Sequence, residues 1–571
     1  MAKWFLSAKK ADFQKIAEEF QIDPVIARII RNRDMITNQE ISTYLFGDKA
    51  LLHDPLLLKD LPKAVKILQE KIKEHRKIRI IGDYDVDGIC ATYILYRSIS
   101  FCGGDVDCVI PHRMKDGYGI NGDLIRKALD EQVDTIITCD NGIAAKEAFV
   151  LAKEMGMTCI ITDHHEVPFT EQNGIRSDVI PAADAVVDPK RQDCAYPFKE
   201  ICGAFVACKL GQVLVSEFTT KKETEELTAE LLEVAGIATV CDIMPLRDEN
   251  RVLVRETLKS LKNPKNMGLR ALMKVNGIEP LKVTAFSIGF VMGPCINATG
   301  RLDTAFIALD LLMAGDGEDA VSLATRLKEL NTSRKEMTEQ GVALAMKELE
   351  NEKYQEQKIL VLYLPRVHES LAGIIAGRVR EKTGKPAFVL TDGEDGVKGS
   401  ARSIEAYSVY EELTRCSDLF TKFGGHKMAA GLSMPKENVE AFRTRINENC
   451  TLTPEDFEEK ILIDVPMPMS YVTKKLILQL KLLEPFGNGN EKPVFAQKNL
   501  AVESISPMGK NGDMARLKVR DEAGGVFEMV MFRGAGQLLL EKPKKIDVLY
   551  YPTINEFRGR ESIQFQLQNY K

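Results

Sequence analysis

Short, unbroken apolar runs alternate with longer amphipathic stretches through the first third of the chain. Two of those stretches, 89–100 and 144–155, have the length and spacing of helices. Strands that are apolar at every position, rather than at alternate ones, are typical of a parallel sheet covered on both faces. The pattern therefore predicts an α/β fold built on a doubly wound parallel sheet. The runs predicted to be strands are 78–81, 106–110, 135–139, 158–162 and 185–187.

Beyond this sheet the pattern changes. The chain is mainly helical from about residue 209, and apolar residues at helical spacing predict one long helix over 318–351. A second α/β pattern follows over 358–435, and the short strands and turns after residue 460 suit a small barrel such as an OB-fold. We expect five parts: an N-terminal helical cap (1–60), the α/β domain (61–317), a connecting helix (318–352), a second α/β domain (353–455) and an OB-like barrel (456–571).

Composition restricts the class of protein only loosely. Of the 571 residues, 44% are hydrophobic and 28% are charged, as in an ordinary globular protein. The net charge of −6 argues weakly against nucleic-acid binding, unless bound metal neutralises a cluster of aspartates. The apolar run near the N-terminus is too short for a signal peptide, and no run is long enough to cross a bilayer. We therefore expect a cytoplasmic protein with no membrane partner. The twelve scattered cysteines predict no structural zinc site.

The segment Asp83-Tyr84-Asp85-Val86-Asp87-Gly88, directly after the first predicted strand, carries the strongest chemical signal. Its three aspartates occupy alternate positions, so extended backbone would direct their side chains to one face. Carboxylates that are this close repel one another unless a cation lies among them, and Mg²⁺ and Mn²⁺ favour oxygen ligands. The alternative is that the aspartates only cap the helix that follows.

Further polar clusters follow other predicted strands. Asp140-Asn141-Gly142 comes after 135–139, and Asp163-His164-His165 comes after 158–162. Because ligands gather at the carboxyl ends of the strands in open α/β sheets, we expect these clusters to face one crevice. Asp242 ends an apolar run that is predicted to be helical and could reach the same place. Five aspartates and a histidine exceed the usual protein share of one ion, which implies two metals.

Taken in order, these segments resemble the four successive motifs of the DHH phosphoesterase superfamily. The run Phe423-Gly424-Gly425-His426-Lys427-Met428-Ala429-Ala430-Gly431 resembles the G-G-H-x-x-A-A-G signature of the DHH-associated domain. The segments 111–119, 297–302 and 483–490 extend the similarity, within the superfamily, to the bacterial exonucleases specific for single-stranded DNA. The resemblance covers nearly the whole chain and implies a DHH catalytic domain, a DHH-associated domain and an OB-like domain that binds nucleic acid.

The resemblance also implies roles for single residues. One ion, Mn²⁺ or Mg²⁺, would be held by Asp83 and Asp85, and a second by Asp87, His164 and Asp242. Asp140 would bridge the two ions, which together activate a water for in-line displacement. The residues expected to be catalytic are Asp85, Asp87, Asp140, His164 and His165, the last of which would lie beside the phosphate. Asp163 would orient the histidines.

Phosphate and DNA binding are predicted at five further residues. Arg301 and Arg402 each lie in a stretch of small residues that is read as a turn, where a guanidinium can approach a phosphate closely. His426 follows two glycines whose exposed N–H groups would form an anion nest. By resemblance, Arg113 and Tyr118 contact the strand near the scissile phosphate. Taken singly, the arginines could be ordinary surface residues, His426 could cap a helix, and Tyr118 could be a core residue.

The resemblance implies a metal-dependent exonuclease that degrades single-stranded DNA in the 5′→3′ direction to 5′-mononucleotides, in DNA repair and recombination. It implies single-stranded DNA as the main partner, a single-strand-binding protein and a helicase as further partners, and a monomer. Two alternatives stay open: a DHH phosphoesterase for short oligonucleotides or cyclic dinucleotides, and a non-catalytic single-strand-binding scaffold. The segment 367–373 departs from the family pattern, since it lacks the usual tryptophan and first glycine. A nucleotide-hydrolysing motor is not supported, because no G-x-x-x-x-G-K-[ST] loop occurs.

Overall fold

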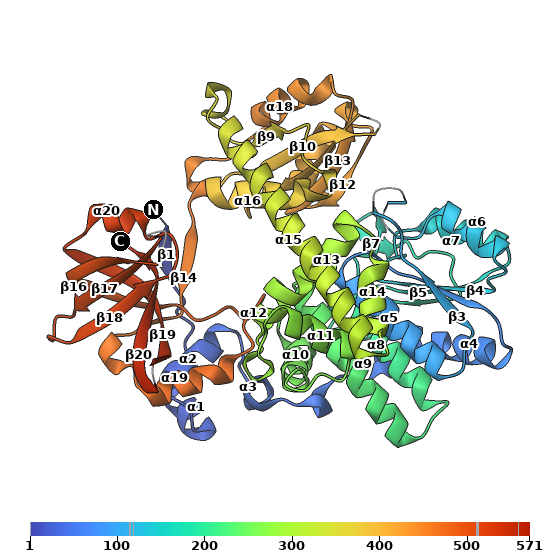
Figure 1. Cartoon of the computed structure of the whole chain (residues 1–571), viewed down its shortest axis with the longest axis horizontal. Coiled ribbons are helices and arrows are strands. Elements are labelled where there is room, and N and C mark those ends of the chain that lie inside the picture. The colour runs from blue at the N-terminus through green and yellow to red at the C-terminus, as the bar shows by residue number, and fades with distance from the viewer. Residues whose placement is uncertain (1, 114–115, 118, 395, 510–512, 558) are drawn as a thin grey trace. The chain divides into compact units, whose positions relative to one another are not determined.

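The computed structural model describes residues 2–113, 116–117, 119–394, 396–509, 513–557 and 559–571. The chain forms two compact units (Figure 1). The smaller unit contains Met1–Leu51, Pro245–Val252 and Glu458–Lys571, and the larger unit contains Leu52–Met244 and Leu253–Phe457.

A five-stranded parallel sheet of described residues lies at the centre of the larger unit, with the strand order β3-β2-β4-β5-β8. Four of the five predicted strands are confirmed to the residue, and the run predicted over 106–110 ends one residue earlier. The chain leaves β2 for β3 on one side and then returns to β4 on the other side. The carboxyl ends of β2 and β4 therefore flank a topological switch point. The strands are β2 (Ile78–Ile81), β3 (Val106–Val109), β4 (Thr135–Cys139), β5 (Thr158–Thr162) and β8 (Ala185–Val187).

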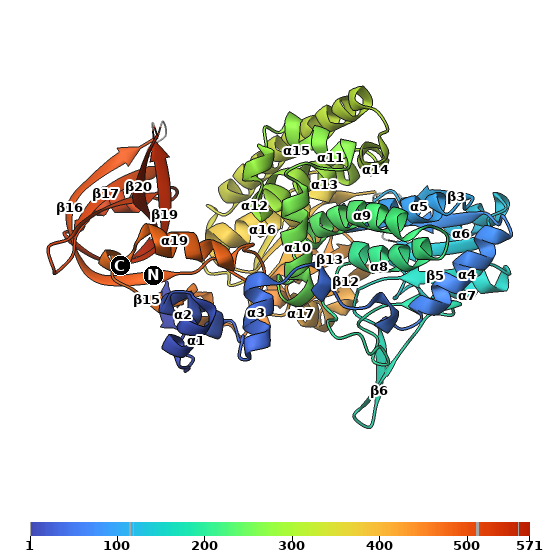
Figure 2. The ribbon, with the colours of Figure 1, turned by 90° about the horizontal axis from the view of Figure 1, so that it is seen from below.

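Alternating side chains bury the two faces of this sheet in different cores. Ile80, Ile137 and Ile160 pack with the helices on one face. Ile81 and Ile136, each adjacent to one of those residues, pack with the helices on the opposite face. This alternation explains why the strands are apolar throughout. The helices of the first face are α4 (Leu61–Lys73), α5 (Val86–Phe101), α8 (Gly203–Ser216) and α9 (Lys221–Cys241), and those of the second are α6 (Gly122–Asp130) and α7 (Lys146–Glu154). A hairpin of β6 (Phe169–Gln172) and β7 (Ile175–Asp178) projects from this sheet (Figure 2).

Helices follow the parallel sheet, as the sequence predicts. The long helix predicted over 318–351 is α15 (Gly317–Glu348), whose first N–H groups are capped by Asp316. Its residues Val342 and Ala345 pack into the core of the second sheet, so α15 joins the two α/β parts of the larger unit. The other helices of this region are α10 (Asp248–Ser260), α11 (Met267–Val275), α12 (Ala285–Ser287), α13 (Gly293–Leu302) and α14 (Phe306–Met313).

The second α/β pattern forms a mixed sheet with the order β12-β13-β11-β10-β9. Only β9 and β10 run parallel; the pairs β10–β11, β11–β13 and β12–β13 are antiparallel. One face packs on α17 and α18, and the other packs on α15 and α16 at its β9–β10 side. The elements are β9 (Leu360–Tyr363), α16 (Ala372–Thr383), β10 (Ala387–Gly393), β11 (Gly396–Arg402), α17 (Val409–Arg415), β12 (Lys422–His426), β13 (Ala429–Met434) and α18 (Asn438–Glu448).

The predicted C-terminal barrel is confirmed within the smaller unit. Strand β16 pairs with both β17 and β19, so the described strands close on themselves in the order β16-β17-β18-β20-β19. A closed barrel leaves no open edge for unwanted strand pairing. The elements are β15 (Val465–Pro466), α19 (Lys474–Leu480), β16 (Phe495–Met508), β17 (Met514–Arg520), β18 (Val526–Met531), α20 (Gly536–Glu541), β19 (Lys545–Phe557) and β20 (Arg560–Tyr570).

The N-terminal helices share one core with the barrel. Ile29 and Leu45 are buried together with Leu480 and Phe495. Strand β1 also pairs in parallel with β14, which precedes the barrel, a contact that the sequence pattern does not predict. The elements are β1 (Lys3–Leu6), α1 (Phe13–Phe20), α2 (Pro24–Asn32), α3 (Asn38–Phe46) and β14 (Lys460–Ile463).

The buried Arg251 joins three distant segments of the smaller unit. Its guanidinium lies 3.9 Å from the centre of the Tyr44 ring and donates to the Tyr44 carbonyl at 2.9 Å. It also donates to the carbonyl oxygens of four consecutive residues at 2.9 to 3.3 Å, namely Leu482, Leu483, Glu484 and Pro485. Arginine can satisfy this many carbonyls because it carries five N–H donors in a fixed plane.

Candidate active site

The aspartates of the first motif lie where β2 ends and α5 begins. Asp85 is the N-cap of α5, and its Oδ1 accepts from the Gly88 N–H at 3.1 Å, so the capping alternative also holds for this residue. Asp83 is buried, and its Oδ1 has no hydrogen-bond partner among the described residues. Capping therefore does not explain this carboxylate, whereas a cation would.

Asp87 is held from a different helix. It lies in the first turn of α5, and its two carboxylate oxygens accept from the N–H groups of Gly203 at 2.6 Å and Ala204 at 2.8 Å. These N–H groups begin α8, where the helix dipole favours a negative charge. The buried Asp87 carboxylate is thereby fixed in orientation.

Asp140 follows β4 with a φ of 59°, in the left-handed region that few residues other than glycine adopt. Such backbone strain is most often found at functional sites. Gly203 lies directly against it: a Cβ on Gly203 would be 2.7 Å from the Asp140 Cβ and 2.9 Å from its Oδ1. The absence of a side chain at Gly203 is therefore what leaves room for the Asp140 carboxylate.

Three carboxylates converge on the ring of His164. The His164 Nε2 lies 3.1 Å from Asp140 Oδ1, 3.5 Å from Asp87 Oδ2 and 3.6 Å from Asp242 Oδ2. Asp242 is the C-cap of α9, as its place after an apolar helical run predicts. The residue after it, Ile243, has a φ of 57°, a rare conformation for a β-branched side chain. Strand ends and one helix end thus meet at one point.

Asp163 orients the neighbouring histidine. Its Oδ1 lies 2.8 Å from the Nδ1 of His165 and accepts from the His164 N–H at 2.8 Å, while its Oδ2 accepts from the Ile143 N–H at 2.9 Å. Among the described contacts, Asp163 meets the ring of His165. Its contact with His164 is a hydrogen bond from the backbone N–H and not from the ring. The two histidine rings lie 4.6 Å apart, and His165 is the more exposed of the two.

The predicted ligands form groups that could hold metal ions. Within each group the potential ligand atoms lie within 4.8 Å of one another. Asp140 and His164 each belong to two of the groups, so neighbouring groups share a ligand. The groups are Asp83-Asp85-Asp140, Asp87-His164-Asp242 and Asp140-His164-His165.

The donor set fits hard divalent cations. It consists of carboxylate oxygens and imidazole nitrogens, with no cysteine among the described residues of these groups. Buried polar atoms of these residues without a hydrogen-bond partner among the described residues include His164 Nδ1 and Asp242 Oδ2, as well as Asp83 Oδ1. Polar atoms are seldom left in this state in a folded core unless an ion or water completes them.

Electrostatics also favours a cation at this place. Burial, together with the neighbouring Asp85, raises the pKa of Asp83 well above its ordinary value. Burial and Asp87 do the same for the pKa of Asp140, and they raise the pKa of Asp242 to about 8. Carboxyl groups whose charges repel in a buried place are returned to the ionised form by a metal.

The two histidines differ in charge. Burial lowers the pKa of His164, so its ring is neutral at pH 7 and can act as a ligand. Burial also opposes the charged form of His165, but the adjacent Asp163 carboxylate outweighs it and raises the pKa of His165 to about 9. In Asp163 the same pairing overcomes burial and lowers the pKa to about 2. His165 therefore carries a proton at pH 7 and can act as a hydrogen-bond donor.

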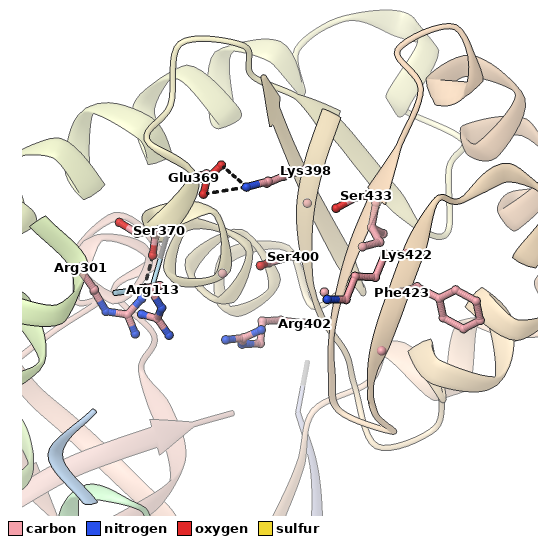
Figure 3. A pocket seen from close by; sticks show the side chains of 15 residues that line it. Arg113, Arg301, Glu369, Ser370, Lys398, Ser400, Arg402, Lys422, Phe423 and Ser433 are labelled. Carbon is pink, nitrogen blue, oxygen red and sulfur yellow. Dashed lines mark hydrogen bonds and ion pairs between the residues drawn. The ribbon is translucent and has the colours of Figure 1, made fainter. Parts of the chain in front are cut away.

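A second polar site lies in a pocket of about 450 Å³ (Figure 3). It contains three of the predicted phosphate-binding arginines, Arg113, Arg301 and Arg402. The Arg301 Nη1 donates to the Ser370 carbonyl at 2.7 Å, and the Arg113 guanidinium lies 4.2 Å from the centre of the Tyr84 ring. Burial and the neighbouring arginines lower the pKa of Arg301 to about 9, so it is still charged at pH 7. Mutually repelling arginines of this kind are stabilised by a bound anion.

Three local predictions about this pocket are wrong. Arg301 is in the last turn of α13 rather than in a turn of small residues, and its neighbour Gly300 lets the helix approach Tyr84, whose carbonyl oxygen would lie 2.5 Å from a Cβ there. Arg402 is the last residue of β11, not part of a turn after it. His426 is the last residue of β12 and not part of a glycine turn. Its neighbour Gly425 has a φ of 145° and lets the strand pass close to β13.

Two predicted contacts with the strand, at His426 and Tyr118, stay predictions. His426 is exposed on the same sheet face as Arg402, since both pair with Ala429, but it is not among the described residues that line the pocket. Tyr118 lies outside the described residues. The prediction that it contacts the strand stays a prediction.

The sequence reasoning missed several site residues. Asp188 follows β8, is fully buried, and has an Oδ2 without a hydrogen-bond partner among the described residues. Its position directly after a buried strand is the sequence signal that could have identified it. Glu369, Ser370, Lys398 and Lys422 line the pocket, and the first two come from the segment that departs from the family pattern. Only the pairing of strands, which sequence does not give, brings the two lysines there.

Comparisons with known proteins agree with this geometry. Residues 77–239 match the DHH family, N-terminal domain; residues 356–451 match the DHHA1 domain; and residues 463–569 match the RecJ OB domain. The chain is 32% identical to the single-stranded-DNA-specific exonuclease RecJ of Bacillus subtilis (strain 168) over 572 residues, which covers 99% of this chain and 70% of that protein. It is 30% identical to the enzyme of the same name from Escherichia coli (strain K12), covering 96% of this chain and 96% of that protein.

The chain belongs to the RecJ family. A solved structure of a member from Thermus thermophilus, in complex with Mn²⁺, matches with a TM-score of 0.83 and 28% identity, covering 100% of this chain and 79% of that one. A second structure of the Thermus RecJ is a complex with Mg²⁺. Among the described residues, no helix combines the length and the apolar character that a membrane span requires.

Proposed function

We propose that this chain is a metal-dependent exonuclease that hydrolyses single-stranded DNA in the 5′→3′ direction and releases 5′-mononucleotides. The observation that carries the proposal is the convergence of Asp83, Asp85, Asp87, Asp140, His164 and Asp242 in overlapping groups beside an arginine-lined pocket. Membership of a family whose relatives are named single-stranded-DNA-specific exonucleases supports the choice of substrate.

We propose two divalent ions, Mn²⁺ or Mg²⁺, as the cofactors. Asp83 and Asp85 would hold one ion, and Asp87, His164 and Asp242 the other, in keeping with two of the groups. Asp140 would contact both ions, since it is grouped with Asp83 and Asp85 and its Oδ1 lies 3.1 Å from His164 Nε2. Bound there, such ions make water a nucleophile at neutral pH and offset the charge of the phosphodiester. The α8 N–H groups that fix Asp87, and the glycine that leaves room for Asp140, keep the ligand atoms in place before any ion binds.

The remaining site residues would bind and orient the strand. The guanidinium groups of Arg113, Arg301 and Arg402 would bind the phosphate at the 5′ end, since planar guanidinium groups form paired bonds with phosphate oxygens. His165, which is protonated and held by Asp163, would donate a hydrogen bond to the scissile phosphate. Cleavage one nucleotide from a bound 5′ end yields a mononucleotide. A terminal-phosphate pocket is thus a physical reason for 5′→3′ polarity.

The barrel at 456–571 would extend the binding surface for the strand, as OB-folds commonly do. We also propose the division of the chain into the parts 1–60, 61–317, 318–352, 353–455 and 456–571. The separate matches to the DHH, DHHA1 and RecJ OB domains support it. A monomer would suffice for this function, and a single-strand-binding protein and a helicase are the protein partners that we propose, because one holds and the other exposes single strands.

The test uses single strands labelled at either the 5′ or the 3′ end, incubated with Mn²⁺. We expect early release of a labelled mononucleotide from the 5′-labelled strand and gradual shortening of the 3′-labelled one. The Asp140→Asn variant, which keeps the size of the side chain, should abolish both. No cleavage by the wild-type protein would favour a binding scaffold, and cleavage of dinucleotides in preference to long strands would favour a phosphoesterase for small substrates.

A further inference from the structure

The pocket extends well beyond the arginines, across one face of the mixed sheet. Helix α16 covers this face over β9 and β10 and reaches the edge of β11, where Gly373 lies against Ser400 and Arg402. Beyond the helix, β11, β13 and β12 line the pocket. Because side chains alternate along a strand, the pairing of these three strands sets the exposed residues in rows that cross the sheet. The rows are Arg402-Ala429-His426, Ser400-Gly431-Gly424 and Lys398-Ser433-Lys422.

The middle row makes an open floor. A Cβ on Gly424 would meet nothing within 4 Å, and a Cβ on Gly431 would come no closer than 3.9 Å to another atom. Crowding therefore does not explain why these positions lack side chains. Their effect is to leave space above the sheet, which forms part of the cavity of about 450 Å³.

The far row is cationic. Lys398 and Lys422 flank Ser433 on adjacent strands, and all three line the pocket. Lys398 is paired with Glu369 at 3.2 Å. Figure 3 shows Lys422 directed into the pocket on the side facing Arg402, whereas Lys398 is turned to Glu369.

The charge of the pocket exceeds that of one terminal phosphate. Its described lining includes five cationic side chains and one carboxylate, a net of four positive charges. These are Arg113, Arg301, Arg402, Lys398 and Lys422, against Glu369. A phosphate monoester carries a charge of about −2 at pH 7. Each further phosphoryl group in a chain adds one more ionised oxygen, so a triphosphate matches the net charge of the lining.

The spacing agrees with this charge count. Arg402 and Lys398 are four residues apart on one strand, or about 13 Å between Cα atoms. A single phosphate on the arginines leaves the lysine row without a ligand. Two further phosphoryl groups, lying over the glycine floor, bring anionic oxygens towards the serine hydroxyl and the ammonium group of Lys422.

We propose that the row Lys398-Ser433-Lys422 binds the outer phosphoryl groups of a single strand that ends in a 5′-triphosphate. This inference rests on the proposed function, because it places the innermost phosphate on the arginines of the same pocket. The substrate range then includes 5′-triphosphorylated strands. A polymerase leaves such a 5′ end when it starts a new strand.

The chemistry of the first cleavage follows from this placement. Water adds its oxygen to the phosphorus between the first and second nucleotides, and the bond from that phosphorus to the 3′-oxygen of the first nucleotide breaks. The 3′-oxygen takes up a proton, and the shortened strand keeps a 5′-monophosphate. The first product is then a nucleoside 5′-triphosphate, and every later product is a nucleoside 5′-monophosphate.

Binding of three oligothymidylates, with a 5′-hydroxyl, a 5′-monophosphate or a 5′-triphosphate, tests the inference. Fluorescence anisotropy of a 3′ label, in EDTA to prevent hydrolysis, gives each Kd. We expect the wild-type protein to bind the triphosphate about tenfold more tightly than the monophosphate, as charge-assisted bonds to lysine would give. Lys422→Ala should bring this ratio close to one, and Glu369→Gln, which frees Lys398 and removes a repelling charge, should raise it.

The matched control is Lys382→Ala, an exposed lysine of α16 outside the described lining of the pocket, which should keep the wild-type ratio. Equal wild-type Kd values for the triphosphate and the monophosphate would overturn the inference but not the proposed function, provided that the monophosphate still binds more tightly than the hydroxyl. If these two also bind alike, the terminal-phosphate pocket itself fails. A uniform loss for all three strands in Lys422→Ala would mean long-range attraction only, and would likewise overturn the inference.

Discussion

Replacing Arg402 by methionine should weaken binding of a 5′-phosphorylated strand far more than binding of the same strand with a 5′-hydroxyl. Among the described contacts, the guanidinium donates a hydrogen bond from Nη1 to the Ala401 carbonyl at 2.8 Å, which leaves donors for a ligand. Its Nη2 would lie 3.0 Å from a Cβ on Gly373, so the side chain is closely packed against α16. Burial and the nearby Arg113 lower the pKa of Arg402, as expected for a buried cation beside another cation.

The size of the effect follows from these contacts. A hydrogen bond between charged groups in a desolvated place contributes about 1.5 to 3 kcal/mol. With about 1.4 kcal/mol for each factor of ten, the loss of affinity for the phosphorylated strand should be roughly 10-fold to 150-fold. The lower part of this range is expected, because removing one arginine also relieves repulsion among the others.

Anisotropy titrations of the two strands in EDTA measure this effect directly. Arg415→Met is the matched control, since Arg415 is on the surface of the same part of the chain and pairs with Glu412 at 2.7 Å, outside the pocket lining. We expect the control to bind both strands as the wild-type protein does. An equal loss for both strands in Arg402→Met, or no loss for either, would refute the assignment of Arg402 to the terminal phosphate.

Three other substitutions test the packing around the metal groups and, separately, the core of the smaller unit. Gly203→Ala should displace the Asp140 carboxylate, because the new Cβ would lie 2.7 Å from its Cβ; calorimetry should show Mn²⁺ affinity falling at least about tenfold, and unchanged affinity would contradict the packing. Arg251→Leu leaves buried carbonyls unpaired and should cost on the order of 3 kcal/mol in urea unfolding of the smaller unit, followed by the fluorescence of the single tryptophan, Trp4, which lies in that unit; an unchanged midpoint would contradict this role. Burial raises the pKa of Asp188 from 3.8 to about 8, so the protonated carboxyl favours folding fully below pH 4, and this contribution is lost as the pH rises towards 8. In EDTA, the Tm of Asp188→Asn should therefore fall less steeply over that range than the Tm of the wild-type protein, and equal slopes for the two proteins would argue against the shift.

The sequence predicted the parallel sheet and most of the metal groups because both depend on local patterns. A strand that is apolar at every position, such as Ile78–Ile81, has few alternatives to a buried parallel strand. The polar residues that follow such strands must meet at one edge of the sheet. Asp83, Asp140 and His164 could therefore be placed together before any coordinates.

The phosphate pocket depended on information that sequence patterns lack. The row that contains Lys398 and Lys422 arises from the register of β13 with β11, which is not its neighbour in the sequence, and with β12. Small residues around Arg301 and Arg402 were interpreted as turns, because glycine and serine favour turns on local grounds. In the structure Gly300 permits close packing of the helix that carries Arg301, and Ser400 lines the pocket from the strand that carries Arg402.

The shared core of the smaller unit was also beyond local reasoning. Helices near residue 30 pack with barrel residues near 480 and 495, and a single buried arginine from residue 251 fixes the segment 482–485. Contacts over such sequence separations leave no periodic signal. Arg251 lies in the charged first turn of a helix, a pattern that is typical of a surface residue.

A crystal structure of the protein with Mn²⁺ and a 5′-phosphorylated, non-hydrolysable oligothymidylate would test the central claim most directly. Anomalous scattering should show two manganese positions, one at Asp83 and Asp85 and one at Asp87, His164 and Asp242, with Asp140 in contact with both. The terminal phosphate should lie on the guanidinium groups of Arg301 and Arg402. A single manganese position, or a strand whose 5′ end lies away from this pocket, would contradict the account.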